Sequence, residues 1–344
     1  MQGETGPGRY DAVRAAGEMK SRRPGSPRGR LPARLSSLWL GVTVVTSIGT
    51  LPLSLRWYNV QELDRAVRHP PSLRPVVPGE RFALGDDPRG LKPAARVAYH
   101  AVSWFGHDDL GRSLFYRILP GFLVSLAIGL AAAVMAVAIG VTWGAAAALA
   151  GGRVDFIMMR LVDVLYGLPY ILMVILLKVG LTRPLTNLLG GHSRGTDLVI
   201  LLLAIGGVSW LTMARVIRGQ VLSLRSQPFV EAARACGAGA FHIFRRHLLP
   251  NLVGPIAVYA ALVIPQAMLQ ESFLSFLGIG IQQPTPTLGR LAADGVGAVN
   301  TFVGYWWLIV FPCAVLVLTL LALNFIGDAL RDAYDPKSQT VGLV

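Results

Sequence analysis

One polar segment, residues 231–251, stands between two long apolar runs and holds the side chains best suited to bind a partner protein. Its distinctive residues are Glu231, Ala232, Ala233, Gly237, Arg245, Leu249 and Pro250. Residues 231–236 contain good helix formers, Gly237 permits a turn, and Pro250 disfavours helix in the residue before it. We therefore predict two short helices joined at Gly237, with the second ending before Pro250.

The sequence excludes ATP hydrolysis by this chain alone. A phosphate-binding Walker loop needs a lysine directly after glycine, followed by serine or threonine. None of the four lysines follows glycine: Lys20, Lys92, Lys178 and Lys337. Energy for any transport must therefore come from another polypeptide or from an ion gradient. The six histidines are scattered without metal-ligand spacing, so we expect neither a metal site nor a bound cofactor.

Glu271 is an ionisable residue inside an apolar run, where charged groups are costly and face protein or water. Two interpretations stay open: a gate or cavity carboxylate that binds a peptide amine, or a buried structural hydrogen bond. Four residues, Ser209, Trp210, Thr212 and Met213, lie in the middle of another apolar run. They are candidates for a translocation pathway, because polar groups there face the bundle interior, although helix packing explains them equally well.

Three further charged residues have a structural explanation. Asp163 stands three residues after Arg160, at the spacing of neighbours on a helix, so we expect these two to pair. Asp328 and Arg331 have the same spacing at the end of the last apolar run and are expected to form a local pair.

The composition is that of a membrane protein. Of the 344 residues, 53% are hydrophobic and 15% are charged, against about 25% charged in soluble domains. The net charge of +13 is better explained by membrane topology and lipid contact than by nucleic-acid binding. We expect an all-α polytopic fold with six spans, at residues 35–55, 121–150, 156–179, 198–217, 252–277 and 305–326.

The remaining segments follow from these spans. Residues 1–34 form a basic leader that we expect to be disordered, and residues 56–104 form an extracytoplasmic loop region. A core of five spans, 105–330, contains the connecting loop 222–251 and precedes a tail, 331–344. The arginines of the leader indicate a cytoplasmic N-terminus, so six spans place both termini and residues 231–251 in the cytoplasm.

The segment from Glu231 to Pro250 resembles the EAA motif of permease subunits in ABC importers, with His247 at a usually apolar position. The resemblance extends to the dipeptide, oligopeptide and nickel branch, and there to its C-type subunit. Its motifs are similar to FGHDDLGRS at 105–113, MRLVD at 159–163, LSFLG at 274–278 with Pro284 and Pro286, and GDALRD at 327–332 with Asp335-Pro336. Together they cover residues 104–336.

This resemblance implies a type I ABC importer permease fold in the cell inner or plasma membrane. It also implies a sister permease subunit, two ATP-binding subunits that hold ATP and Mg, and an extracytoplasmic substrate-binding protein. Glu231 would sit in a cleft of an ATPase subunit, with Gly237 supplying the turn. Peptides or similar small solutes are the implied cargo.

Two other classes remain open from the residues alone. One is a proton-coupled secondary transporter that uses Glu271 or Asp163, although no internal repeat of the kind common in such transporters is evident. The other is a membrane scaffold with no transport role.

Overall fold

A computed structural model describes residues 27–61, 70–72, 101, 103–191, 193–298 and 304–334 of the chain. Within these ranges every named element is a helix, and six helical segments are long and apolar enough to cross a membrane, which confirms the all-α prediction with six spans. The candidate spans are Leu31–Gly49, Leu114–Ala150, Tyr170–Leu188, Gly195–Arg225, Ala240–Phe276 and Trp307–Tyr334.

The helices fall into a long set and a short set. The longer ones are α2 (Pro27–Gly49), α5 (Leu114–Ala150), α6 (Gly152–Tyr166), α7 (Tyr170–Leu188), α8 (Arg194–Arg225), α11 (Leu249–Phe276) and α13 (Trp307–Tyr334). The shorter ones are α3 (Leu51–Trp57), α9 (Pro228–Ala235), α10 (Ala240–Ile243), the π-helical turn η3 (Phe244–Leu248) and α12 (Leu288–Ala298).

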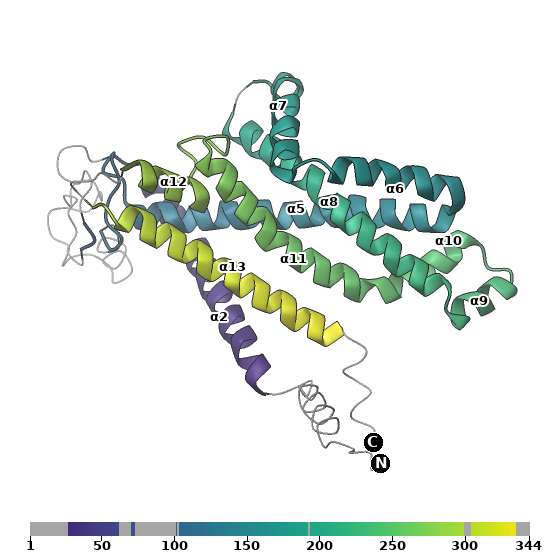
Figure 1. The fold of residues 1–344 in the computed structure, drawn as a ribbon. Helices are drawn as coiled ribbons and strands as arrows, with labels where there is room; N and C mark the ends of the chain where they lie inside the picture. Colours follow the sequence, from purple (N-terminus) through teal and green to yellow (C-terminus); the bar gives the residue numbers. More distant parts are fainter. Residues whose placement is uncertain are drawn as a thin grey trace, which may run out of the picture.

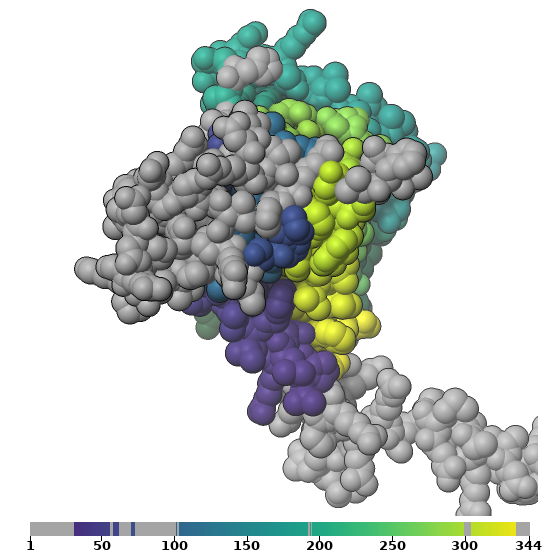
Figure 2. All heavy atoms as spheres, turned by 90° about the vertical axis from the view of Figure 1, so that its left-hand side faces the viewer, coloured from purple at the N-terminus to yellow at the C-terminus, as the bar shows by residue number. Residues whose placement is uncertain are grey.

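Helix α5 runs along the molecule and packs against α8 and α11 (Figure 1). The helices α9 and α10 lie at one end of this bundle, and α12 lies at the opposite end. Helix α13 packs on α11, α12 and α2, and Figure 2 shows α2 and α13 side by side.

Glycines allow α5 and α8 to approach closely. A Cβ added to Gly144 would lie 2.3 Å from the carbonyl oxygen of Ala214, and one added to Gly140 would lie 2.6 Å from the Cβ of Met213. Small residues let the backbones of membrane helices come together, which gains packing energy where lipid offers no hydrophobic driving force. This tight contact fixes α8 against the long axis of the bundle.

The predicted third span, 156–179, is wrong as a single helix. Helix α6 ends at Tyr166, α7 begins at Tyr170, and only α7 qualifies as a candidate span. Pro169 lies at the break, where it provides the N-cap of α7 and disfavours helix in Leu168. The apolar character of the sequence continues through this break and conceals it.

The first helix also differs from its prediction. Helix α2 begins at Pro27 rather than near residue 35, so residues 27–34, predicted to be disordered, are helical. The predicted span 35–55 is divided at Thr50, and α3 follows with Pro52 among its first two residues, where a proline is tolerated. The predictions for 1–26, most of 56–104, and 335–344 lie outside the described residues.

Candidate functional site

Helices α9 and α10 and the turn η3 form a projecting unit, residues 228–248, which we call the knob (Figure 1). Three buried side chains, Val230, Ile243 and Leu248, anchor it in a core cluster with residues of α5, α8 and α11. Because the anchors come from both halves of the knob, it is attached to three long helices rather than suspended on a loop.

The exposed surface of the knob carries most of the residues singled out in the sequence. Glu231, Ala232, Gly237, Arg245 and Pro250 are exposed, whereas Ala233 and Leu249 are half-buried. Glu231 lies in the first turn of α9, where a carboxylate is favoured by the helix dipole. Two aromatic rings, Phe229 and Phe241, are also exposed, the latter by 75%. Exposed aromatic and arginine side chains are typical anchors of a protein interface.

Gly237 makes the predicted turn. Its φ is +82°, a left-handed conformation that glycine adopts without strain. The amide of Gly237 donates to Arg234 O at 3.0 Å, and the amide of Ala238 donates to Ala233 O at 3.1 Å. These bonds satisfy carbonyl groups at the end of α9, in the manner of a glycine C-cap.

The predicted end of the second helix before Pro250 is wrong. Helix α10 passes into η3, and η3 passes into α11, so the knob continues directly into a candidate span. Pro250 lies among the first two residues of α11. The change from π-helical to α-helical hydrogen bonding falls at this boundary, so the missing amide of proline interrupts no regular α-helical ladder there.

Two arginines tie α8 to its neighbours α6 and α5. Arg218 of α8 donates from Nε and NH2 to the two oxygens of Asp155 in α6, both at 2.6 Å. This hydrogen bonding from Arg218 lowers the pKa of Asp155, and burial opposes it more weakly. Arg225 donates to the carbonyl oxygen of Ala148 at 2.6 Å, which ties the end of α8 to the end of α5.

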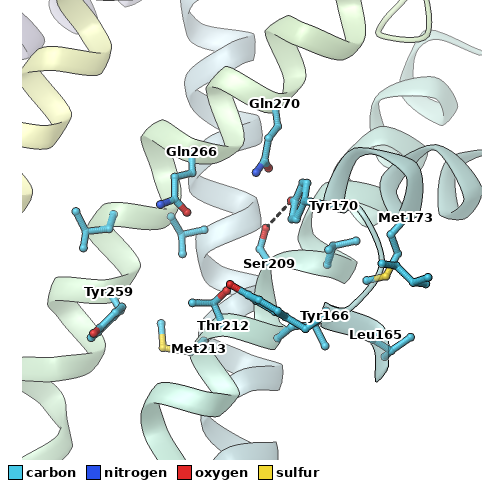
Figure 3. A pocket seen from close by; sticks show the side chains of 15 residues that line it. Leu165, Tyr166, Tyr170, Met173, Ser209, Thr212, Met213, Tyr259, Gln266 and Gln270 are labelled. Atoms are coloured by element: carbon cyan, nitrogen blue, oxygen red, sulfur yellow. Dashed lines mark hydrogen bonds between the residues drawn. The ribbon is translucent and has the colours of Figure 1, made fainter. Parts of the chain in front are cut away.

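A cavity of about 510 Å³ lies between the α6–α7 junction, α8 and α11 (Figure 3). Its polar side chains include Ser209 and Thr212 from α8 and Gln266 and Gln270 from α11. Tyr170 is within hydrogen-bond distance of Ser209, at 3.3 Å between the hydroxyl oxygens. The volume lies within the range of about 300–1,000 Å³ that is usual for ligand pockets.

The cavity includes three of the four candidate pathway residues on α8. Ser209, Thr212 and Met213 line it. Trp210 instead packs edge-on against Trp143, with ring centroids 5.3 Å apart, and its Nε1 donates to the carbonyl oxygen of Gly207 at 3.1 Å. Helix packing therefore accounts for Trp210.

Glu271 lies outside the cavity lining and is fully buried. Ser125 of α5 donates to one of its carboxylate oxygens at 3.1 Å, and Ser275 donates to the other at 2.8 Å. The amide of Leu288, at the start of α12, donates to Ser125 Oγ at 3.2 Å. This geometry favours the structural interpretation, in which Glu271 joins α5, α11 and α12.

The other predicted charge pairs are wrong. Asp163 pairs with Arg215 of α8 at 2.9 Å rather than with Arg160, and the Arg215 guanidinium also lies 4.1 Å from the ring centre of Tyr166. In the part of α13 that the structure describes, Asp328 and Arg331 are both exposed and no ion pair joins them. A helical spacing permits such pairs, but a nearby partner on another helix can compete.

A buried ion network at the opposite end was not predicted. Asp108 accepts hydrogen bonds from Arg112 Nε at 2.7 Å and from Arg117 NH1 at 2.5 Å. Arg117, only 1% exposed, also lies 3.6 Å from Asp294 of α12, which pairs with Arg290 at 3.0 Å. The network joins the segment before α5 to α12. The motif at 105–113 was a signal for it, but not for its partner on α12.

Comparisons with known proteins agree on one family. Residues 136–340 match the family model described as binding-protein-dependent transport system inner membrane component. The dipeptide transport system permease protein DppC of Bacillus subtilis is 46% identical over 69% of each chain. The oligopeptide transport system permease protein OppC of Escherichia coli K12 is 43% identical over 69% of this chain and 73% of that protein.

A solved structure has the same fold. It is an inward-facing form of the MetNI methionine ABC transporter, with a TM-score of 0.52 and 18% identity. The match covers 64% of this chain and 97% of the other. At that identity the likeness concerns the fold alone, and it agrees with the type I permease fold predicted from the sequence.

Proposed function

Because the chain belongs to the family of binding-protein-dependent transport system inner membrane components, and is a membrane-spanning permease subunit of an ABC importer, we propose that its cargo is peptides. The supporting observation is the identity of 42–46% to permease proteins named for dipeptide or oligopeptide transport. A cavity of about 510 Å³ in the helical bundle supplies a place for part of the path.

The working complex in this proposal contains a sister permease, two ATP-binding subunits that hold ATP and Mg, and an extracytoplasmic substrate-binding protein. The knob lies on the cytoplasmic side, and both chain termini are cytoplasmic as well. Helix α13 supports this arrangement, since its end lies toward the end of the bundle that carries the knob (Figure 1). The basic residues of the knob, including Arg234, Arg245 and Arg246, agree with the excess of positive charge on cytoplasmic loops.

Glu231 is the residue proposed to contact the ATPase subunit. It is exposed on helix α9, and the residue before it, Val230, is buried in the core, so a partner that binds the exposed side of α9 acts on the helical bundle. A carboxylate there accepts hydrogen bonds from a partner, and the small side chains of Ala232 and Ala233 permit close approach. Arg245 belongs to the knob, and Leu249 and Pro250 follow it directly.

The proton-coupled secondary transporter is not supported. The family membership indicates an importer whose energy comes from other subunits. Neither carboxylate that such a mechanism would use lines the cavity: Glu271 is buried among hydroxyl groups, and Asp163 is paired with Arg215.

The test is Glu231→Ala in the complete importer, reconstituted in vesicles with its binding protein and supplied with ATP inside. We expect the complex to assemble, since the Glu231 side chain is exposed, while ATP hydrolysis no longer drives uptake of a labelled dipeptide. Gln227→Ala is the matched control, because Gln227 is exposed beside α9 and its side chain makes no cap hydrogen bond. Uptake at the unmodified rate in Glu231→Ala would show that the contact lies elsewhere.

A further inference from the structure

The lining of the cavity carries no charge. Fifteen described residues line it, and none of them is acidic, basic or histidine (Figure 3). The ion pair of Arg215 with Asp163 lies outside the lining, and its guanidinium stands 4.1 Å from the ring centre of Tyr166. A lining charge would attract one sign of cargo and repel the other, so this cavity lacks that means of discrimination.

The polar groups of the cavity come from two facing helices. Gln266 and Gln270 are four residues apart on α11 and share a face, and Ser209 and Thr212 are three residues apart on α8. Each carboxamide offers two donors and an acceptor, so it can bond either main-chain group of a peptide. The Oε1 atom of Gln270 is enclosed and accepts no hydrogen bond from the described residues, so a small rotation of this carboxamide would bring an unused acceptor to the cavity.

The spacing of the two glutamines matches an extended chain. Four residues of helix rise by about 6.0 Å at 1.5 Å per residue. Two residues of an extended strand rise by about 6.4–6.8 Å, and main-chain groups that point the same way recur at that interval. The two carboxamides are therefore placed to meet equivalent groups of residues n and n+2 along one edge of a peptide.

The rest of the lining suits variable side chains. Met173 and Met213 form its buried floor, and the aromatic ring of Tyr259 offers a face that accepts apolar or cationic groups. We propose that this cavity binds the main chain of an extended peptide through Gln266 and Gln270 and accepts its side chains regardless of their charge. This inference rests on the proposed function and adds to it a mode of recognition within the permease itself.

The test uses the complete importer in vesicles, with binding protein saturated by each of three peptides: Ala-Ala-Ala, Ala-Lys-Ala and Ala-Asp-Ala. Maximal uptake rates remove differences in affinity for the binding protein. We expect the three rates to agree within about threefold, because no lining charge separates them. In Gln270→Glu, uptake of Ala-Asp-Ala should fall about tenfold relative to Ala-Lys-Ala, because like charges repel in the site.

Main-chain recognition is tested with an analogue of Ala-Ala-Ala in which an ester replaces the central amide. The unmodified importer should carry it about tenfold more slowly, since a site built to bond an N–H rejects the analogue lacking it. In Gln266→Leu/Gln270→Leu, uptake of the parent peptide should fall and the ratio between the two should approach one. Gln220→Leu is the control, because Gln220 is exposed on α8 outside the cavity.

Each result is decisive. Retained stimulation of ATP hydrolysis by the loaded binding protein verifies that the leucine variant is assembled. A preference of the unmodified importer for one charge overturns charge tolerance, and an unchanged ester ratio in the leucine variant overturns main-chain recognition. If the unmodified importer takes up none of the three peptides, the proposed peptide function is refuted, and this inference with it.

Discussion

The buried network around Asp108 predicts a large loss of stability when its carboxylate is removed. Asp108 accepts four hydrogen bonds, from the amides of Leu110 and Arg112 and from the guanidinium groups of Arg112 and Arg117. In Asp108→Ala the guanidinium of Arg117, which is 1% exposed, loses its closest counter-charge. Removing one partner of a buried ion pair costs about 3–5 kcal/mol, because the other charge remains buried.

The assay is unfolding of the purified chain in detergent, with Arg117→Met and the double variant measured alongside. Because methionine removes the stranded charge, the double variant should be more stable than the sum of the single losses predicts, by about 1–3 kcal/mol. Asp332→Ala, at an exposed position on α13, should change the free energy of unfolding by less than about 0.5 kcal/mol. Additive effects of Asp108→Ala and Arg117→Met would refute the reasoning.

Three further predictions concern the bundle. Gly144→Ala should lower the free energy of unfolding by about 1–3 kcal/mol, because the added methyl group clashes with α8. Gly219→Ala, which has open space around it, should raise the free energy of unfolding by about 0.5–1 kcal/mol. Equal effects of the two variants would contradict the close contact between α5 and α8. Asp155→Asn should cost about 1–3 kcal/mol near neutral pH. Folding lowers the pKa of Asp155, so its contribution to stability is present above the unfolded pKa of about 3.9 and disappears as pH falls below that value. A loss of stability in Asp155→Asn that persists in acid would exclude a stabilising ion pair between Asp155 and Arg218. Glu271→Gln should leave the pH dependence of peptide uptake unchanged, because the hydroxyls around it can rebond to a carboxamide; a shifted pH profile would restore a titrating role.

The helical class and the knob were predictable because their signals are local. Apolar runs long enough to cross a bilayer show directly in the sequence, and Gly237 marks a turn by its lack of a side chain. The junction at Pro169 was missed, since apolar residues continue across it. The end predicted at Pro250 was wrong, because proline is also tolerated in the first turn of a helix.

The unpredicted features depend on distant residues. Arg218 and Asp155 are 63 residues apart in sequence, and Lys178 of α7 donates to the carbonyl oxygens of Ile279 and Gly280, about a hundred residues away. No spacing rule within one helix identifies such partners. Gln266 and Gln270 did carry a signal, since two amides one turn apart in an apolar span are unusual, but only the fold shows that they face Ser209 across a cavity.

The helix continues without a gap from α10 through η3 into α11, so a movement of the knob is transmitted along α11. From Leu249 to Gln266 the helix is about 26 Å long, so a tilt of about 10° at the knob would move the cavity end by about 4–5 Å. That displacement exceeds the length of a hydrogen bond. That figure is for a rigid helix; Pro255 and Pro265 each remove a backbone hydrogen bond from α11, so bending at these two positions would reduce the movement that reaches Gln266.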